Sequence, residues 1–230
     1  MLKEYLQRKN KKSALRINDN VHLNFLAPLP GHINVGSVMS YLQKIDDNFL
    51  NCVDGIYITH LPEFDKRNIN AIFKDNAIYV TNRQDSVEDL LDDIVHELGH
   101  ALEDRFNKVI YDDCQLQSEF LHKRDELWDR LSERNHQPKH IGRDRFLTVD
   151  YNKSLDKWFA EDFGYDNLRN IANDLFASPY GATSLREYWA NGFENYLMGN
   201  KEKVKSSSPI LFDKIEEILA STDKKFYEFE

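Results

Sequence analysis

The stretch SVEDLLDDIVHELGHALED, residues 86–104, decides the fold prediction because it joins a helical apolar pattern to a His-Glu-x-x-His motif. Ser86 can cap a helix here, and acidic residues crowd its first turns, where the helix dipole favours negative charge. The stretch therefore predicts one packed amphipathic helix that carries His96, Glu97 and His100. Its apolar residues recur at the spacing of one buried helix face, namely Val87, Leu91, Ile94, Leu98 and Leu102.

The two histidines of this motif are four residues apart, so on a helix they point the same way. Both imidazoles can then reach one ion, while Glu97 can contact a water on that ion without being a ligand. This arrangement is typical of a zinc site with a carboxylate as general base. Zinc lowers the pKa of a bound water to about 7, and Glu97 would take the proton as that water attacks a carbonyl. The alternative, two surface histidines near a glutamate, is disfavoured by the apolar stripe.

A catalytic zinc needs a third protein ligand and one open position. Glu103 is the nearest candidate, but it lies about 10.5 Å along the helix axis from His96, since each residue adds 1.5 Å. We therefore expect Glu103 to support the ligands or to lie on the surface. Three later histidines are expected to be exposed, namely His122, His136 and His140.

A better third ligand lies in SPYGATSLREYWANGFENYLMG, residues 178–199. Glu187 is the candidate, although Ser184 and Glu187 also match a helix capping box, and on spacing alone the two roles stay open. Tyr180 precedes the predicted helix between a proline and a glycine, so its phenol can project into a cleft. A phenol donor can stabilise an oxyanion, and the alternative for Tyr180 is a packing role.

Together the two segments resemble the anthrax-lethal-factor-like metallopeptidases, a family of gluzincin type that includes the secreted clostridial Pro-Pro endopeptidases. The resemblance covers roughly residues 70–200, and it implies that His96, His100 and Glu187 bind zinc. It also implies that Glu97 is the base and that Tyr180 stabilises the oxyanion. HELGH is followed by the pattern Y-G-x-T-x-x-x-E-[FYW]-[FYW]-A-x-x-F, which is filled by Tyr180, Gly181, Thr183, Glu187, Tyr188, Trp189, Ala190 and Phe193.

Two features depart from the family pattern. Asn191 stands where the family commonly has an acid that could orient a zinc-bound imidazole, so that support is expected to be weaker or to come from Glu103, Asp104 or Glu194. The interval between His100 and the third ligand is also long, and a helical segment over residues 118–140 is expected to cover or shape the cleft. The family's substrate preference therefore does not carry over.

The order of predicted elements indicates an α+β fold. Strands are expected within residues 55–61 and 69–82, the latter with a tight hairpin at Asp75-Asn76. Helices are expected to dominate later, over most of residues 115–176 and within 184–199 and 209–221. We expect a small, mainly antiparallel sheet packed on the helix of the HExxH motif, and the family resemblance implies that this fold is zincin-like.

The expected domain organisation is a basic N-terminal arm or helix over residues 1–20, followed by one domain over 21–230. Within that domain we expect an α/β lobe over about 21–110 and a mostly helical lobe over about 111–230. The first sixteen residues hold six Lys or Arg against one Glu, so the arm is either a solvated helix or a segment that docks on an acidic partner.

Composition limits the possible partners and location. The net charge of −9 disfavours a nucleic-acid-binding protein. No apolar signal-peptide region and no run of membrane-spanning length is visible, which predicts a soluble cytoplasmic protein without a membrane partner. Delivery to another cell stays open. Cys52 and Cys114 have no CxxC spacing, so we expect two buried thiols and no disulfide framework.

The functional hypothesis is a zinc metalloendopeptidase that acts on protein or peptide substrates. Ile78 and Val80, directly before the motif helix, are expected on a sheet edge where a substrate strand could add. One alternative is a dedicated intracellular regulatory protease that cuts one partner. Another is a non-catalytic scaffold with a structural zinc, which Asn191 would favour. The substrate, the biological setting (a toxin-related one included) and the oligomeric state are not predicted.

Overall fold

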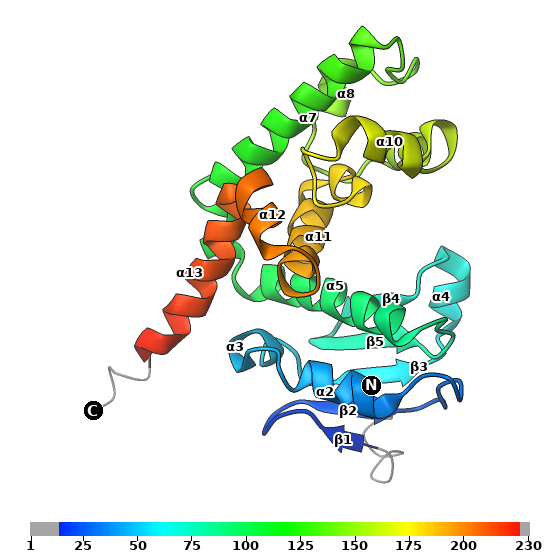
Figure 1. The fold of residues 1–230 in the computed structure, drawn as a ribbon, viewed down its shortest axis with the longest axis vertical. Helices are drawn as coiled ribbons and strands as arrows, with labels where there is room; N and C mark the ends of the chain where they lie inside the picture. The colour runs from blue at the N-terminus through cyan, green and yellow to red at the C-terminus, as the bar shows by residue number, and fades with distance from the viewer. Residues whose placement is uncertain (1–13, 226–230) are drawn as a thin grey trace. The chain divides into compact units, whose positions relative to one another are not determined.

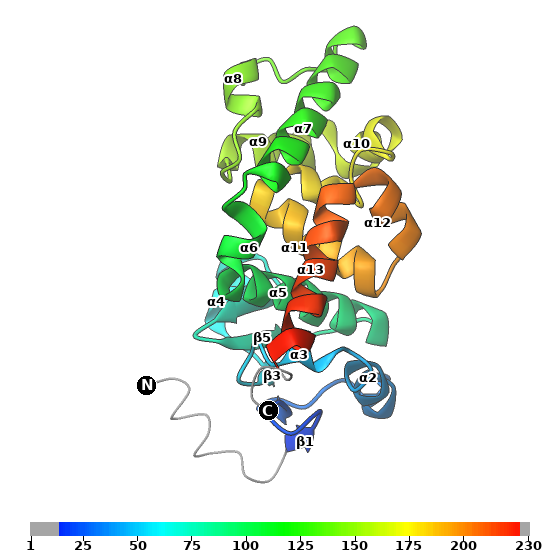
Figure 2. The same cartoon turned by 90° about the vertical axis from the view of Figure 1, so that its left-hand side faces the viewer.

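The computed structural model describes residues 14–225, with residues 221–225 as backbone alone. The chain divides into two compact units, Met1–Arg105 and Phe106–Glu230. All strands of the described residues belong to unit 1, whereas the described part of unit 2 is helical (Figures 1 and 2). The predicted α+β class is confirmed. The predicted basic arm lies outside the described residues up to residue 13.

The sheet of unit 1 is mixed, with the strand order β1-β2-β3-β5-β4. The outer pairs β1/β2 and β4/β5 are antiparallel, whereas β3 runs parallel to both of its neighbours, β2 and β5. The strands are β1 (Ala14–Arg16), β2 (His22–Phe25), β3 (Ile56–Thr59), β4 (Ala71–Lys74) and β5 (Ala77–Thr81).

The prediction of a mainly antiparallel sheet is wrong, and the connections explain why. Parallel neighbours need a crossover that returns the chain to the same end of the sheet. Between β2 and β3 this crossover contains α2 (Val35–Leu42) and α3 (Asp47–Leu50). Between β3 and β5 the chain passes through α4 (Pro62–Arg67) and the edge strand β4. Local sequence patterns revealed the hairpin but not these longer returns.

Both faces of the central strands are covered. On one face Tyr57 stacks on Tyr79, with ring centroids 5.3 Å apart, and Phe64 of α4 joins their apolar cluster. On the other face α5 (Val87–Arg105) packs against β4 and β5, as Figure 1 shows, and α2 and α3 contact α5 in turn. The apolar face of α5 therefore packs against the sheet, as predicted.

The helix of the HExxH motif forms as its sequence predicts. The Ser86 hydroxyl caps it, accepting a hydrogen bond from the Asp89 backbone N–H at 3.0 Å. The predicted stripe is buried from its second member onward, whereas Val87 is only partly buried. Because this face is fixed against the sheet, the polar residues of α5 have defined orientations.

Unit 2 is built around three helices, α7, α11 and α13, that contact one another (Figure 2). Residues 118–140, expected as an inserted helical segment, form most of α7 and a following loop; α7 contributes Phe120 and Leu127 to the core. The helical elements are α6 (Asn107–Tyr111), α7 (Gln115–Glu133), α8 (Arg143–Phe146), α9 (Lys153–Lys157), a π-helix (Trp158–Phe163), α10 (Tyr165–Ala172), a 3-10 turn (Pro179–Ala182), α11 (Leu185–Leu197), α12 (Lys201–Ser207) and α13 (Pro209–Lys225).

Two further expectations concern cysteines and membranes. Cys52 is buried, but the prediction is wrong for Cys114, which is exposed. Cys114 precedes α7 with φ 58°, so it belongs to a turn and not to a packed helix face. Among the helices of the described residues, none is long and apolar enough to cross a membrane.

The predicted hairpin is confirmed, and it yields a stability test. Asp75 and Asn76 both adopt positive φ, 52° and 57°, as a two-residue type I′ turn requires. We expect Asn76→Gly to preserve or raise stability. Asn76→Val should lower the free energy of unfolding by about 1–2 kcal/mol, because a β-branched residue is strained there. Urea denaturation measures both effects. Lys74→Val, exposed in the adjacent strand, is the control, and an equal loss from both valine variants would contradict the turn assignment.

Candidate functional site

The two histidines of α5 lie side by side in unit 1. Their ring centroids are 5.0 Å apart and the ring planes are nearly perpendicular, at 83°. His100 is buried, with 6% of its surface exposed, and His96 is partly buried. The four-residue spacing therefore brings both imidazoles to one side of a packed helix.

Glu103 lies one turn beyond the motif and contacts a histidine. Its Oε2 is 3.3 Å from Nδ1 of His100, and the two side chains are 13% and 8% exposed. A carboxylate at Nδ1 fixes the tautomer and orientation of the ring and leaves Nε2 for an ion. The contact therefore restricts the orientation of the His100 ring.

The carboxylate of Glu97 reaches the sheet. Its Oε2 accepts a hydrogen bond of 2.6 Å from the backbone N–H of Phe73 in β4. This N–H is therefore directed towards α5 and away from the β5 ladder. The bond fixes the side chain of Glu97 at the outer edge of the sheet.

The placement of Ile78 and Val80 corrects one prediction. Both residues belong to β5, which lies between β3 and β4, and both are 0% exposed. A substrate strand cannot add to an interior strand, so these residues are core residues and not contacts for a substrate. The edge strand on this side of the sheet is β4. The local sequence pattern predicts the β4/β5 hairpin, but it does not show which of the two strands pairs with β3.

Sequence reasoning missed Asp93, which lies one turn before Glu97 on α5. The side-chain amide of Gln84 donates to Asp93 Oδ2 at 2.8 Å, and the backbone carbonyl of Gln84 is 3.2 Å from Nε2 of His32. Burial raises the pKa of the Asp93 carboxyl from 3.8 to about 6; the Gln84 hydrogen bond opposes this rise and the charge of Glu97 adds to it. The sequence signal for Asp93 was its position four residues before Glu97, on the same side of the helix. Asp93 was not singled out because other acids occur in the first turns of the same helix.

Glu187 occupies the first turn of α11 in unit 2. The Ser184 hydroxyl accepts a hydrogen bond of 3.2 Å from the backbone N–H of Glu187, so the helix is capped as one half of the capping box predicts. This bond uses the backbone of Glu187. Capping by Ser184 therefore does not compete with a ligand role for the carboxylate.

Tyr180 lies in the 3-10 turn before α11 and is 39% exposed. Its carbonyl accepts the Thr183 hydroxyl at 2.8 Å, and its ring meets the ring of Tyr165 edge-on, with centroids 6.3 Å apart. Partial burial, and next the charge of Glu187, raise the pKa of the Tyr180 phenol above its ordinary value. The phenol therefore stays protonated at neutral pH and can donate a hydrogen bond.

Asn191 fixes the start of the Tyr180 turn. It is 4% exposed; its Oδ1 accepts the Ser178 backbone N–H at 3.1 Å, and its Nδ2 is 3.5 Å from Glu194 Oε2. A Cβ added at Gly181 would come within 3.1 Å of the same Oδ1, so the turn passes close to this amide. These hydrogen bonds of Asn191 lie within unit 2 and hold the turn that carries Tyr180.

Arg124 of α7 fixes the other end of this turn, and sequence reasoning missed it. Its guanidinium donates to the carbonyls of Ala182 and Phe146, and the side chain is 0% exposed. The rings of Phe120, Phe146 and Phe159 surround it, the closest centroid being 4.5 Å from Cζ. Burial lowers the pKa of Arg124 to about 9. A charged residue in a polar-looking helix gave no signal of this placement.

The three histidines expected to be exposed, His122, His136 and His140, are exposed.

No protein-family model matches the chain, and comparisons with characterised proteins and with solved structures find no significant match.

Substitution of Asp93 tests the environment of α5 through its pH dependence. The folded-state pKa is raised, so ionising Asp93 costs stability as the pH rises from about 4 to about 6. We expect Asp93→Asn, which keeps an acceptor for Gln84, to stabilise the metal-free protein by about 1–3 kcal/mol at pH 8 and to have little effect at pH 4. Urea denaturation at both pH values measures this. A gain of equal size at both pH values would contradict it, and Asp89→Asn, exposed on the same helix, is the control.

Substitution of Asn191 tests its hold on the Tyr180 turn. Asn191→Leu leaves the Ser178 N–H without its partner, which should cost about 1–3 kcal/mol of stability and reduce the hydrogen-exchange protection of that amide. Asn191→Asp keeps the acceptor and should retain the protection. Unchanged protection in Asn191→Leu would show that the amide does not fix the turn.

Proposed function

We propose that the chain is a zinc-dependent endopeptidase of gluzincin type, with a zincin-like fold, that hydrolyses peptide bonds of protein substrates. One observation carries the proposal. The two imidazoles of the HExxH helix, His96 and His100, lie on one side of α5 with ring centroids 5.0 Å apart, so one ion can contact both, and we assign Glu187 as the third ligand. Two imidazole nitrogens and one carboxylate oxygen are the donor set of a catalytic zinc site that keeps a fourth position for water or substrate.

The residues around this donor set support the same proposal. Glu103 at Nδ1 of His100 is the kind of partner that orients a metal-binding imidazole and raises its basicity. A bound zinc would supply Lewis acidity and would lower the pKa of a bound water to about 7. Because the Phe73 N–H occupies Oε2 of Glu97, we assign Oε1 as the oxygen that takes the proton of the attacking water and returns it to the leaving amine.

Tyr180 is the proposed oxyanion donor. Its phenol is held protonated, and its turn is fixed at Ser178 by Asn191 and at Ala182 by Arg124. A donor whose position is set before the reaction stabilises developing negative charge without reorganisation at the moment of reaction. Asn191 and Arg124 thus hold the turn in place before the reaction, as this role requires.

The substrate strand is proposed to lie along the outer edge of β4. Phe73 directs its N–H away from β5, and alternate residues of an edge strand share one side, so the backbone groups of Ala71 face the same outer edge. An extended peptide could pair by strand addition with the backbone groups of this edge that Glu97 does not use, namely the Phe73 carbonyl and the groups of Ala71. This edge takes the place of Ile78 and Val80 in the earlier expectation.

The test separates the ligand role of Glu187 from its position in a helix cap. Glu187→Gln should lower zinc affinity by at least about tenfold and abolish cleavage of a mixed peptide library. Ser184→Ala should cost about 0.5–2 kcal/mol of stability through loss of the cap, while zinc stoichiometry is retained. Glu97→Gln should keep zinc and the fold but lose cleavage. Metal analysis, denaturation and library digestion provide the three readouts.

Two outcomes would contradict the proposal. Cleavage that persists in Glu97→Gln would exclude the assigned base. Zinc binding that is unchanged in Glu187→Gln and lost in Ser184→Ala would show that helix capping, and not ligation, is the function of this segment.

A further inference from the structure

Unit 2 contains a cavity of about 290 Å³ beside the Tyr180 turn. Its floor is formed by the buried side chains of Leu168, Ala172 and Phe176, and polar residues of α10, its C-terminal end and α12 line it as well: Arg169, Asn173 and Lys203. The volume lies just below the range of small-molecule sites, about 300–1,000 Å³, and suits a single side chain.

The two cations of this cavity are weakly neutralised. Lys203 Nζ has a neutral partner, the amide oxygen of Asn173 at 3.3 Å. Arg169 faces Asp166 at 3.5 Å, with the two side chains 62% and 95% exposed, so solvent screens that pair strongly. Positive charge is therefore available to an occupant.

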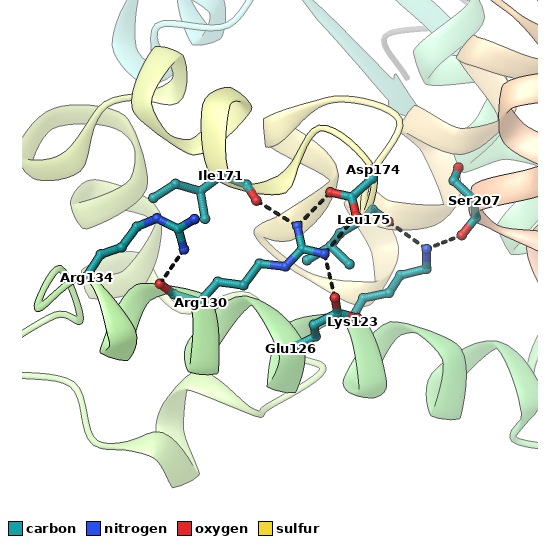
Figure 3. Close-up of polar contacts among 8 residues, drawn as sticks. All are labelled: Lys123, Glu126, Arg130, Arg134, Ile171, Asp174, Leu175 and Ser207. Atoms are coloured by element: carbon teal, nitrogen blue, oxygen red, sulfur yellow. Dashed lines mark hydrogen bonds and ion pairs between the residues drawn. The ribbon is translucent and has the colours of Figure 1, made fainter.

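Asp174, which directly follows the lining residue Asn173, is engaged elsewhere. Arg130 of α7 donates to both of its carboxylate oxygens, at 2.6 and 2.7 Å, and holds the pKa of Asp174 at about 2 (Figure 3). Lys123 of α7 donates to the carbonyls of Leu175 and Ser207, as the same view shows. Helix α7 thus fixes this segment and takes up its carboxylate, which cannot neutralise Lys203 at the same time.

The residues that line the cavity include the two that directly precede the proposed oxyanion donor. Ser178 and Pro179 both line it, and Tyr180 follows directly. A group bound in the cavity would therefore lie next to the turn that Asn191 and Arg124 hold in place. If a peptide carbonyl contacts Tyr180, as proposed, the side chain of a neighbouring residue is the part of the substrate that would enter this cavity.

We infer that this cavity binds an acidic side chain of the peptide substrate, glutamate in particular. The apolar floor suits the methylene groups of glutamate, and Arg169 and Lys203 suit its carboxylate. The chain as a whole carries a net charge of −9, which repels acidic peptides at long range, so a local pair of cations is needed to select them. The inference rests on the proposed peptidase function for the identity of the occupant.

Binding of two peptide pools tests the inference without cleavage. The pools are rhodamine-labelled hexapeptides, randomised among uncharged residues except at the third position, which is Glu in one pool and Gln in the other. The protein is the zinc-loaded full chain with Glu97→Gln, and fluorescence anisotropy at low ionic strength is the readout. We expect the Glu pool to bind about fivefold more tightly, the scale of one or two partly exposed ion pairs. Added Lys203→Glu should abolish or invert this preference.

Lys205→Glu is the matched control, because it changes the same charge on the same helix at an exposed position outside the cavity lining. It should keep most of the preference for the Glu pool. Equal binding of both pools, or an equal loss in the two variants, would overturn the inference. Failure of the peptidase proposal is distinguishable, since the wild-type chain would then cleave no member of a mixed library whatever the pools show.

Discussion

The burial of α5 against β4 and β5 is the constraint on which the candidate site depends. Because the apolar stripe of this helix is fixed to the sheet, the residues on its other sides have defined directions, and His96 and His100 lie edge to face 5.0 Å apart. The same packing buries the contact between His100 and Glu103, and it brings Glu97 within hydrogen-bond distance of the β4 backbone. Without this packing against the sheet, the side chains of the three motif residues would have no defined directions.

Unit 2 meets a different constraint, the fixing of a short turn that precedes α11. A buried guanidinium without a carboxylate partner is costly, and Arg124 compensates with two backbone carbonyls and three aromatic rings. One of those carbonyls belongs to Ala182, and the amide of Asn191 holds Ser178 at the other end. These contacts fix the turn that carries Tyr180. A fixed turn is what the proposed role of Tyr180 as oxyanion donor requires.

Local features were predictable from the sequence, and non-local pairings were not. The Ser86 cap, the buried face of α5 and the Asp75-Asn76 turn involve residues within a few positions of one another, so spacing predicts them. The interior position of β5 depends on which strands meet after a crossover, and the error on Ile78 and Val80 follows from that. The bond from Arg124 to Ala182 joins residues 58 positions apart, and no periodicity signals it. Asn191 was singled out for its place in a pattern, but its hydrogen-bond partner, Ser178, was not predictable.

X-ray absorption at the zinc K-edge of the zinc-loaded full chain tests the central claim most directly. If His96, His100 and Glu187 bind one ion, the spectrum should fit two imidazole nitrogens at about 2.0–2.1 Å and carboxylate or water oxygens at about 2.0–2.2 Å, without sulfur. The spectrum of Glu187→Gln should then lose the carboxylate contribution. A sulfur shell, or a spectrum that does not change between the wild type and Glu187→Gln, would contradict the claim.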